Sequence, residues 1–95
     1  MNIAILTSGG DSSGMNPAIK KFVEYSYDLG YTPFFVYNGL EGLIDSQIKK
    51  ASYKDVAGII YRGGTIIRSS RSKRWYEKKY RKTAFDNLKK HNIDA

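Results

Sequence analysis

The beginning of the chain alternates between short apolar runs and a longer amphipathic run. Residues 3–6 are continuously apolar, which is typical of a strand buried on both faces of a parallel sheet. Residues 17–29 have apolar or small side chains every three or four positions, which predicts one buried face of a helix. These inward positions are Ile19, Phe22, Val23 and Ser26. Residues 32–37 predict a second strand, and a right-handed crossover would make the two strands parallel.

A glycine-rich stretch, residues 7–16, joins the first strand to the helix. Gly9, Gly10 and Gly14 allow positive φ angles and the close approach of another group. Asn16 is predicted to cap the helix and Pro17 to be its first residue. Such a turn before a helix N-terminus is suited to bind phosphate. It matches neither the mononucleotide loop nor Gly-x-Gly-x-x-Gly, and a tight connection without a ligand is the alternative.

The second half of the chain predicts shorter elements and then one long helix. Residues 38–44 indicate a turn or a short helical piece, and residues 48–51 a short strand. Ser52 is predicted to cap a helix over residues 53–61, which Gly63 and Gly64 would follow. A basic helix is predicted over residues 73–91. Its expected core-facing positions are Tyr76, Tyr80, Ala84 and Leu88, with Phe85 beside them.

The end of the predicted long helix has its own signals. His91 is expected to interact with the helix C-terminus, and a single His without a cysteine makes no metal site. Asn92 is a candidate helix stop, and residues 93–95 resemble the entry to another strand. The chain therefore reads as the first part of a larger α/β domain, cut at a strand.

Charge is distributed unevenly along the chain, whose net charge is +7. Residues 1–61 carry five basic and six acidic side chains, whereas residues 62–95 carry eleven and three. This asymmetry suggests an anionic partner, or simply a solvated helix face. The absence of cysteine and of a long apolar run favours a soluble cytoplasmic protein that does not bind a membrane.

Four segments in order resemble the 6-phosphofructokinase family: residues 7–16, 37–43, 55–67 and 87–95. The resemblance implies a kinase that moves the γ-phosphoryl group of ATP to fructose 6-phosphate, with Mg²⁺, in glycolysis. It implies the start of a doubly wound, mainly parallel three-layer α/β/α sandwich, truncated at the third major strand. Residues 1–95 would then be an N-terminal fragment of the nucleotide-binding domain of an enzyme that forms homo-oligomers, tetramers in the family.

By position, the resemblance places Gly10 against the ATP phosphates, together with its neighbours Gly9 and Asp11. Arg71 would reach the transferring phosphoryl group, where a planar, permanently charged guanidinium stabilises developing charge. Ser72 would line the nucleotide site, and Trp75 would lie near the adenine. The residues that support Mg²⁺, act as base and hold the sugar phosphate would follow Ala95, so the 95-residue chain is expected to be inactive alone.

Some positions depart from the family pattern. Lys20 keeps a basic charge at an effector-binding position, but Glu24 reverses the next one. These changes argue against allosteric control by ADP or phosphoenolpyruvate. Two alternatives stay open: a pyrophosphate-dependent phosphofructokinase, and a non-catalytic module that binds nucleotide or nucleic acid through its basic half. Nucleic acid is not the expected partner, because the tyrosines have core spacing and the resemblance is long.

Overall fold

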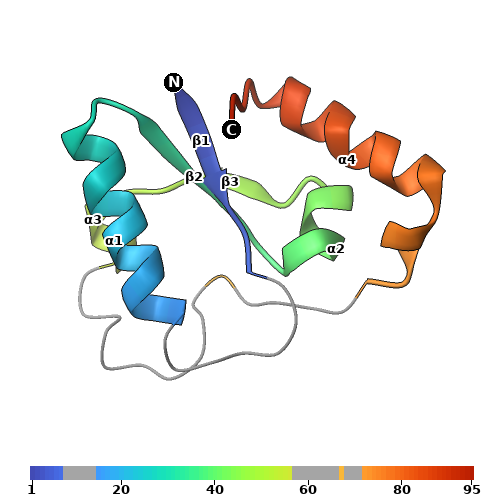
Figure 1. The fold of residues 1–95 in the computed structure, drawn as a ribbon, viewed down its shortest axis with the longest axis horizontal. Coiled ribbons are helices and arrows are strands. Elements are labelled where there is room, and N and C mark those ends of the chain that lie inside the picture. Colours follow the sequence, from blue (N-terminus) through green and yellow to red (C-terminus); the bar gives the residue numbers. More distant parts are fainter. Residues whose placement is uncertain (8–14, 57–66, 68–71) are drawn as a thin grey trace.

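A three-stranded mixed sheet lies at the centre of the chain, with helices on both of its faces (Figure 1). The structure is a computed structural model that describes residues 1–7, 15–56, 67 and 72–95. The strands are β1 (Asn2–Ile5), β2 (Thr32–Val36) and β3 (Ile48–Lys50), in that order across the sheet. β1 and β2 are parallel, as predicted, and β3 is antiparallel to β2. The predicted α/β architecture is confirmed.

Two hydrophobic clusters lie on opposite faces of the sheet because successive side chains of a strand point in opposite directions. On β2, Phe35 belongs to one cluster and Val36 to the other, and each is 1% exposed. We call the first the α1-side core, made of Ile19, Val23, Phe35, Ala51 and Ile67. We call the second the α4-side core, made of Val36, Leu43, Ile44 and Ala84.

Helix α1 (Met15–Asp28) covers the first of these faces, with Ile19 and Val23 fully buried as predicted. The prediction that Asn16 caps this helix is wrong, because the helix begins at Met15 and Asn16 is a buried residue of its first turn. Pro17 is tolerated there because the first N–H groups of a helix lack intrahelical partners. The predicted stop at Gly30 is confirmed: Gly30 has φ +77°, and N–H groups of Gly30 and Tyr31 satisfy carbonyls of the last turn.

The two short helices of the middle of the chain are α2 (Gly39–Ile44) and α3 (Tyr53–Val56). The predicted cap at Ser52 is confirmed, but its side-chain hydrogen bonds run from Ser52 to the Asp55 carboxylate. The Asp55 carboxylate accepts hydrogen bonds from the Ser52 backbone N–H (2.8 Å) and hydroxyl (3.1 Å), as the acidic partner of a capping box does. The rest of the predicted helix, residues 57–61, lies outside the described residues, as do Gly63 and Gly64.

The predicted single helix over residues 73–91 is wrong. Instead, a short 3₁₀ helix, η2 (Arg74–Tyr76), and helix α4 (Lys78–Lys90) are separated by Glu77, which has extended backbone angles. This break changes the phase of the apolar stripe. Tyr76 is 82% exposed and Phe85 59% exposed, so neither belongs to the core. Ala84 is buried, and Tyr80 and Leu88 pack against the α4-side core, so those three positions are confirmed.

The chain after α4 returns to the free edge of β1, next to the N-terminus (Figure 1). Asn92 is the predicted stop, with φ +57° and the same pattern of terminal hydrogen bonds as Gly30. The Asn2 carbonyl accepts from the Ala95 N–H, and the Ala4 N–H donates to the Ala95 carbonyl at 2.8 Å. These bonds on either side of Ile3 begin a parallel pairing, which supports the prediction of a strand entry there.

Candidate functional site

The carboxyl ends of β1 and β2 lie at the same edge of the sheet because these strands are parallel. α1 begins and α2 packs at this lower edge in Figure 1. In open α/β sheets, ligands bind at the carboxyl ends of the strands. The glycine-rich turn joins the end of β1 to α1 at this edge, but Gly9, Gly10 and Asp11 lie outside the described residues.

The start of α1 is fixed by burial. Asn16 in its first turn is fully buried, and one turn further Ile19 packs in the α1-side core with no exposed surface. The helix N-terminus is therefore held at the carboxyl edge of the sheet. Free N–H groups at such a terminus carry partial positive charge, which favours an anion.

A second segment returns to this edge at Ile67, which is fully buried. Asn38, in the left-handed conformation between β2 and α2, donates its backbone N–H to the Ile67 carbonyl at 2.8 Å. Its side-chain amide donates to Gln47 Oε1 at 2.7 Å. Arg71, four positions after Ile67, lies outside the described residues.

Ser72 lies just before η2, and Trp75 lies on η2, beside α2. The Ser72 hydroxyl accepts the Trp75 backbone N–H at 3.2 Å. Trp75 is half-buried and packs against the α4-side core. Ser72 keeps part of its surface exposed. Of the predicted nucleotide site, the structure therefore describes two residues, with the Ser72 hydroxyl bound to the backbone of Trp75.

Arg74 is the residue of this region that sequence reasoning missed. Its Nε donates to Glu41 Oε2 at 2.7 Å, its Nη2 also contacts Glu41 Oε2, and the same Nη2 donates to Asp45 Oδ2 at 2.9 Å. The hydrogen bonds that Arg74 donates, to Asp45 first and to Glu41 second, raise the pKa of Arg74 above its already high usual value. A signal existed: Glu41 and Asp45 lie one helical turn apart, on a face where an arginine could pair with both.

The remaining predicted residues lie away from this edge or have structural partners. Lys20 is half-buried on α1, beside a shallow hollow that Lys21 and Glu24 also line. His91 caps the end of α4, as predicted, and its Nε2 lies 3.1 Å from the Ser46 hydroxyl. In the described part of the chain, no group of three or more His, Asp or Glu side chains could hold a metal.

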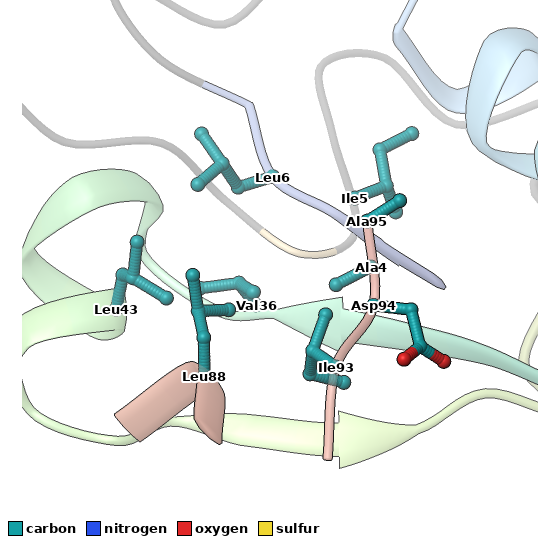
Figure 2. Close-up of a pocket in the computed structure, with 9 residues that line it drawn as sticks. All are labelled: Ala4, Ile5, Leu6, Val36, Leu43, Leu88, Ile93, Asp94 and Ala95. Carbon is teal, nitrogen blue, oxygen red and sulfur yellow. The ribbon is translucent and has the colours of Figure 1, made fainter. Parts of the chain in front are cut away.

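An apolar cavity of about 220 Å³ lies between β1, α2 and α4 (Figure 2). Leu6, Val36, Leu43 and Leu88 line it with apolar side chains. Asp94 also lines it, but the Asp94 carboxylate accepts the Asn2 backbone N–H at 2.8 Å. The cavity offers no cationic group for a phosphate, so the candidate site is the carboxyl edge of the sheet.

The fold and this edge define an α/β protein whose ligand site is built from loops after parallel strands. The phosphofructokinase family model matches residues 2–95, and the chain belongs to that family. The chain is 66% identical over 94 residues to an ATP-dependent 6-phosphofructokinase of Sulfurovum sp. and 68% identical over 93 residues to that of Sulfurimonas denitrificans. These matches cover 99% and 98% of the chain, but 29% of each relative's length.

Solved structures agree with this assignment. A phosphofructokinase from Saccharomyces cerevisiae superposes with a TM-score of 0.93 at 40% identity, over 98% of this chain and 13% of that one. The family resemblance drawn from the sequence and the predicted fold class are thereby confirmed. Among the described helices, none combines the length and apolar character that a membrane crossing requires.

Proposed function

We propose that residues 1–95 form the N-terminal part of the nucleotide-binding domain of an ATP-dependent 6-phosphofructokinase. This enzyme transfers the γ-phosphoryl group of ATP to the 1-hydroxyl of fructose 6-phosphate in glycolysis, giving fructose 1,6-bisphosphate. The observation that carries the proposal is the identity of 66% and 68% to relatives with that name, over nearly the whole chain. Such an enzyme would act in the cytoplasm as a homo-oligomer.

The proposed roles come from the family resemblance, and the chemistry of each residue suits its role. Gly9, Gly10 and Asp11 would contribute to the turn against the ATP phosphates. Arg71 would stabilise charge on the transferring oxygens, because its guanidinium is planar and always charged. Ser72 offers a hydroxyl next to it in sequence, and Trp75 offers an aromatic surface for the adenine.

The described residues contain no group of three or more His, Asp or Glu side chains that could hold magnesium by themselves. The carboxylates of Glu41 and Asp45, on and after α2, are already paired with Arg74. By the family resemblance, the magnesium-supporting residues would belong to the part of the enzyme that corresponds to positions after Ala95.

A chimeric enzyme tests the proposal. Residues 1–95 would replace the corresponding part of the Sulfurovum relative, which matches 99% of this chain. We expect ATP-dependent phosphorylation of fructose 6-phosphate, and a fall in kcat of about 10³-fold for Arg71→Ala, in the range found when transition-state charge stabilisation is removed. The unaltered relative is the positive control. A folded chimera without activity would contradict the proposal.

The 95-residue protein is proposed to be inactive alone, because phosphoryl transfer needs metal, positioned nucleophile and charge clamp together. ADP formation that depends on fructose 6-phosphate with the purified protein would overturn this. Titrating the same protein with ATP and with pyrophosphate tests which of them is the phosphoryl donor. A pyrophosphate-dependent enzyme would show no binding preference for the nucleotide.

One observation favours a second candidate, a non-catalytic module that binds polyanions. Tyr76 and Phe85 are exposed rather than in the core. They lie among exposed lysines of the α4 region: Lys73, Lys78, Lys79, Lys82, Lys89 and Lys90. Aromatic rings among cations suit single-stranded nucleic acid. Binding to a single-stranded oligonucleotide that falls steeply between about 50 and 200 mM salt, and weakens in Phe85→Ala, would support this candidate.

A further inference from the structure

The segment that leads from Ile67 to Glu77 is attached to α2 at both of its described ends. At one end, the Ile67 carbonyl accepts the backbone N–H of Asn38, the residue that precedes α2. At the other end, Arg74 pairs with Glu41 in the first turn of α2 and with Asp45 at its C-cap. α2 is therefore the common support of the two flanks.

The Arg74 guanidinium makes several contacts at once. It binds Glu41 through both Nε and Nη2 and Asp45 through Nη2, and its Cζ lies 5.4 Å from the centre of the Tyr80 ring. A planar guanidinium can form these hydrogen bonds in its plane while its face meets an aromatic ring, and a lysine cannot do both. Arg74 thus links η2, α2 and α4.

The orientation of η2 depends on its contacts with α2 and α4. A 3₁₀ helix of three residues is weakly stable by itself, and Tyr76 at its end is 82% exposed. Glu77 after it is extended. Trp75 packs against the α4-side core, so the orientation of η2 rests on Trp75 and Arg74. Without Arg74, Glu41 and Asp45 would also face each other as like charges one turn apart.

We propose that Arg74 is a positioning residue of the nucleotide site. By fixing η2 on α2, it holds the Ser72 hydroxyl and the Trp75 ring where ATP is bound. The inference rests on the proposed function and deepens it, because Arg74 itself contacts carboxylates of α2 rather than the nucleotide. Its loss would therefore act on ATP and leave the sugar phosphate unaffected.

Kinetics of the chimeric enzyme test the positioning role. Arg74→Ala should raise KM for ATP about tenfold through misplaced binding groups, with KM for fructose 6-phosphate unchanged. Arg74→Lys should recover only part of the loss. Arg81→Ala is the matched control, because it removes the same charge from α4, where the described residues give the Arg81 side chain no ion pair. Equal changes in both KM values, or none, would overturn the proposal.

The acceptor side supplies an independent check. The double variant Glu41→Gln with Asp45→Asn should reproduce the effect of Arg74→Ala on KM for ATP. Adding Arg74→Ala to that pair should change little further, because all three residues belong to one interaction network. Losses that multiply would show that Arg74 acts elsewhere, which would overturn the anchoring of η2 on α2.

Trp75 is the protein's one tryptophan, so its fluorescence reports on η2 directly in the 95-residue protein. We expect Arg74→Ala to shift the Trp75 emission to longer wavelength and to increase its quenching by acrylamide. The helical circular dichroism signal of the protein should be retained. Arg81→Ala should change neither. An inactive wild-type chimera would overturn the proposed function, whereas unchanged Trp75 emission in Arg74→Ala would overturn the anchoring itself.

Discussion

The two faces of the sheet are covered in different ways. On the α1 side, the buried side chains of the core are all apolar and 0–1% exposed. On the α4 side, the core is smaller and its members are 1–5% exposed. There, polar contacts between helices supplement the packing: Asn87 and Arg74 both bind α2, and His91 lies beside Ser46.

The difference teaches which forces position the candidate site. Burial of an apolar face is non-directional, so the periodicity of α1 does most to place it on the sheet, with a hydrogen bond from the Tyr27 hydroxyl to the Ala51 carbonyl (2.6 Å). Hydrogen bonds and ion pairs are directional, so they determine where α4 and η2 lie along α2. The part of the candidate site that bears Ser72 and Trp75 is therefore placed by the polar partners of Arg74 together with the packing of Trp75.

The largest expected effect is on the α1 side. Ile19→Ala should lower the free energy of unfolding by about 3 kcal/mol, because it leaves a cavity in a fully buried cluster. Urea denaturation followed by circular dichroism measures this. Tyr25→Ala is the control on the same helix, since Tyr25 is 62% exposed, and it should change stability little. Similar losses for both variants would mean that α1 does not pack as described.

A smaller effect is expected on the α4 side. The Asn87 amide donates to the Leu43 carbonyl (2.8 Å) and the Ile44 carbonyl (2.9 Å), which end α2. Asn87→Ala would remove this donor from both carbonyls and leave Leu43 with only the longer contact from the Ser46 N–H (3.4 Å), so it should destabilise the protein by about 2 kcal/mol. Asp86→Ala, at the exposed neighbouring position, should stay close to wild type. If the two variants were equally stable, the polar account of the α4 side would be wrong.

Much of the fold could be predicted from the sequence, because local rules dominate there. The apolar run of β1, the stripe of α1 and the stops at Gly30 and Asn92 depend on residues close in sequence. The break at Glu77 could not be found in this way. Arg74 pairs with carboxylates about thirty positions earlier, at Glu41 and Asp45. Helical periodicity describes neighbours along one helix and does not detect such a distant contact.

The candidate site was less accessible to sequence reasoning. The glycine turn and Arg71 were singled out by their chemistry and family resemblance, and they lie outside the described residues, so their roles stay predictions. Ser72 and Trp75 belong to the described residues, and Trp75 packs against the α4-side core, but their roles at a nucleotide also stay predictions. Asn87 was missed because a polar residue on a helix is normally assigned to its wet face, whereas here its amide satisfies the end of α2.

The smallest effect is a pH dependence on the α1 side. Tyr37 follows β2 and packs against the α1-side core, and its burial, with the nearby Asp55 charge, raises the pKa of its hydroxyl above 10.0. In the unfolded chain Tyr37 loses its proton near pH 10, whereas the folded chain retains it to higher pH. The unfolded state then binds fewer protons, so this contribution to stability is complete below pH 10 and is lost as pH rises through the raised pKa.

Tyr37→Phe should therefore lose stability less steeply than wild type above pH 10, in urea denaturation at a series of pH values. Tyr25→Phe, at an exposed position, should follow the wild-type curve. Parallel curves for wild type and Tyr37→Phe would show that burial does not hold the Tyr37 proton.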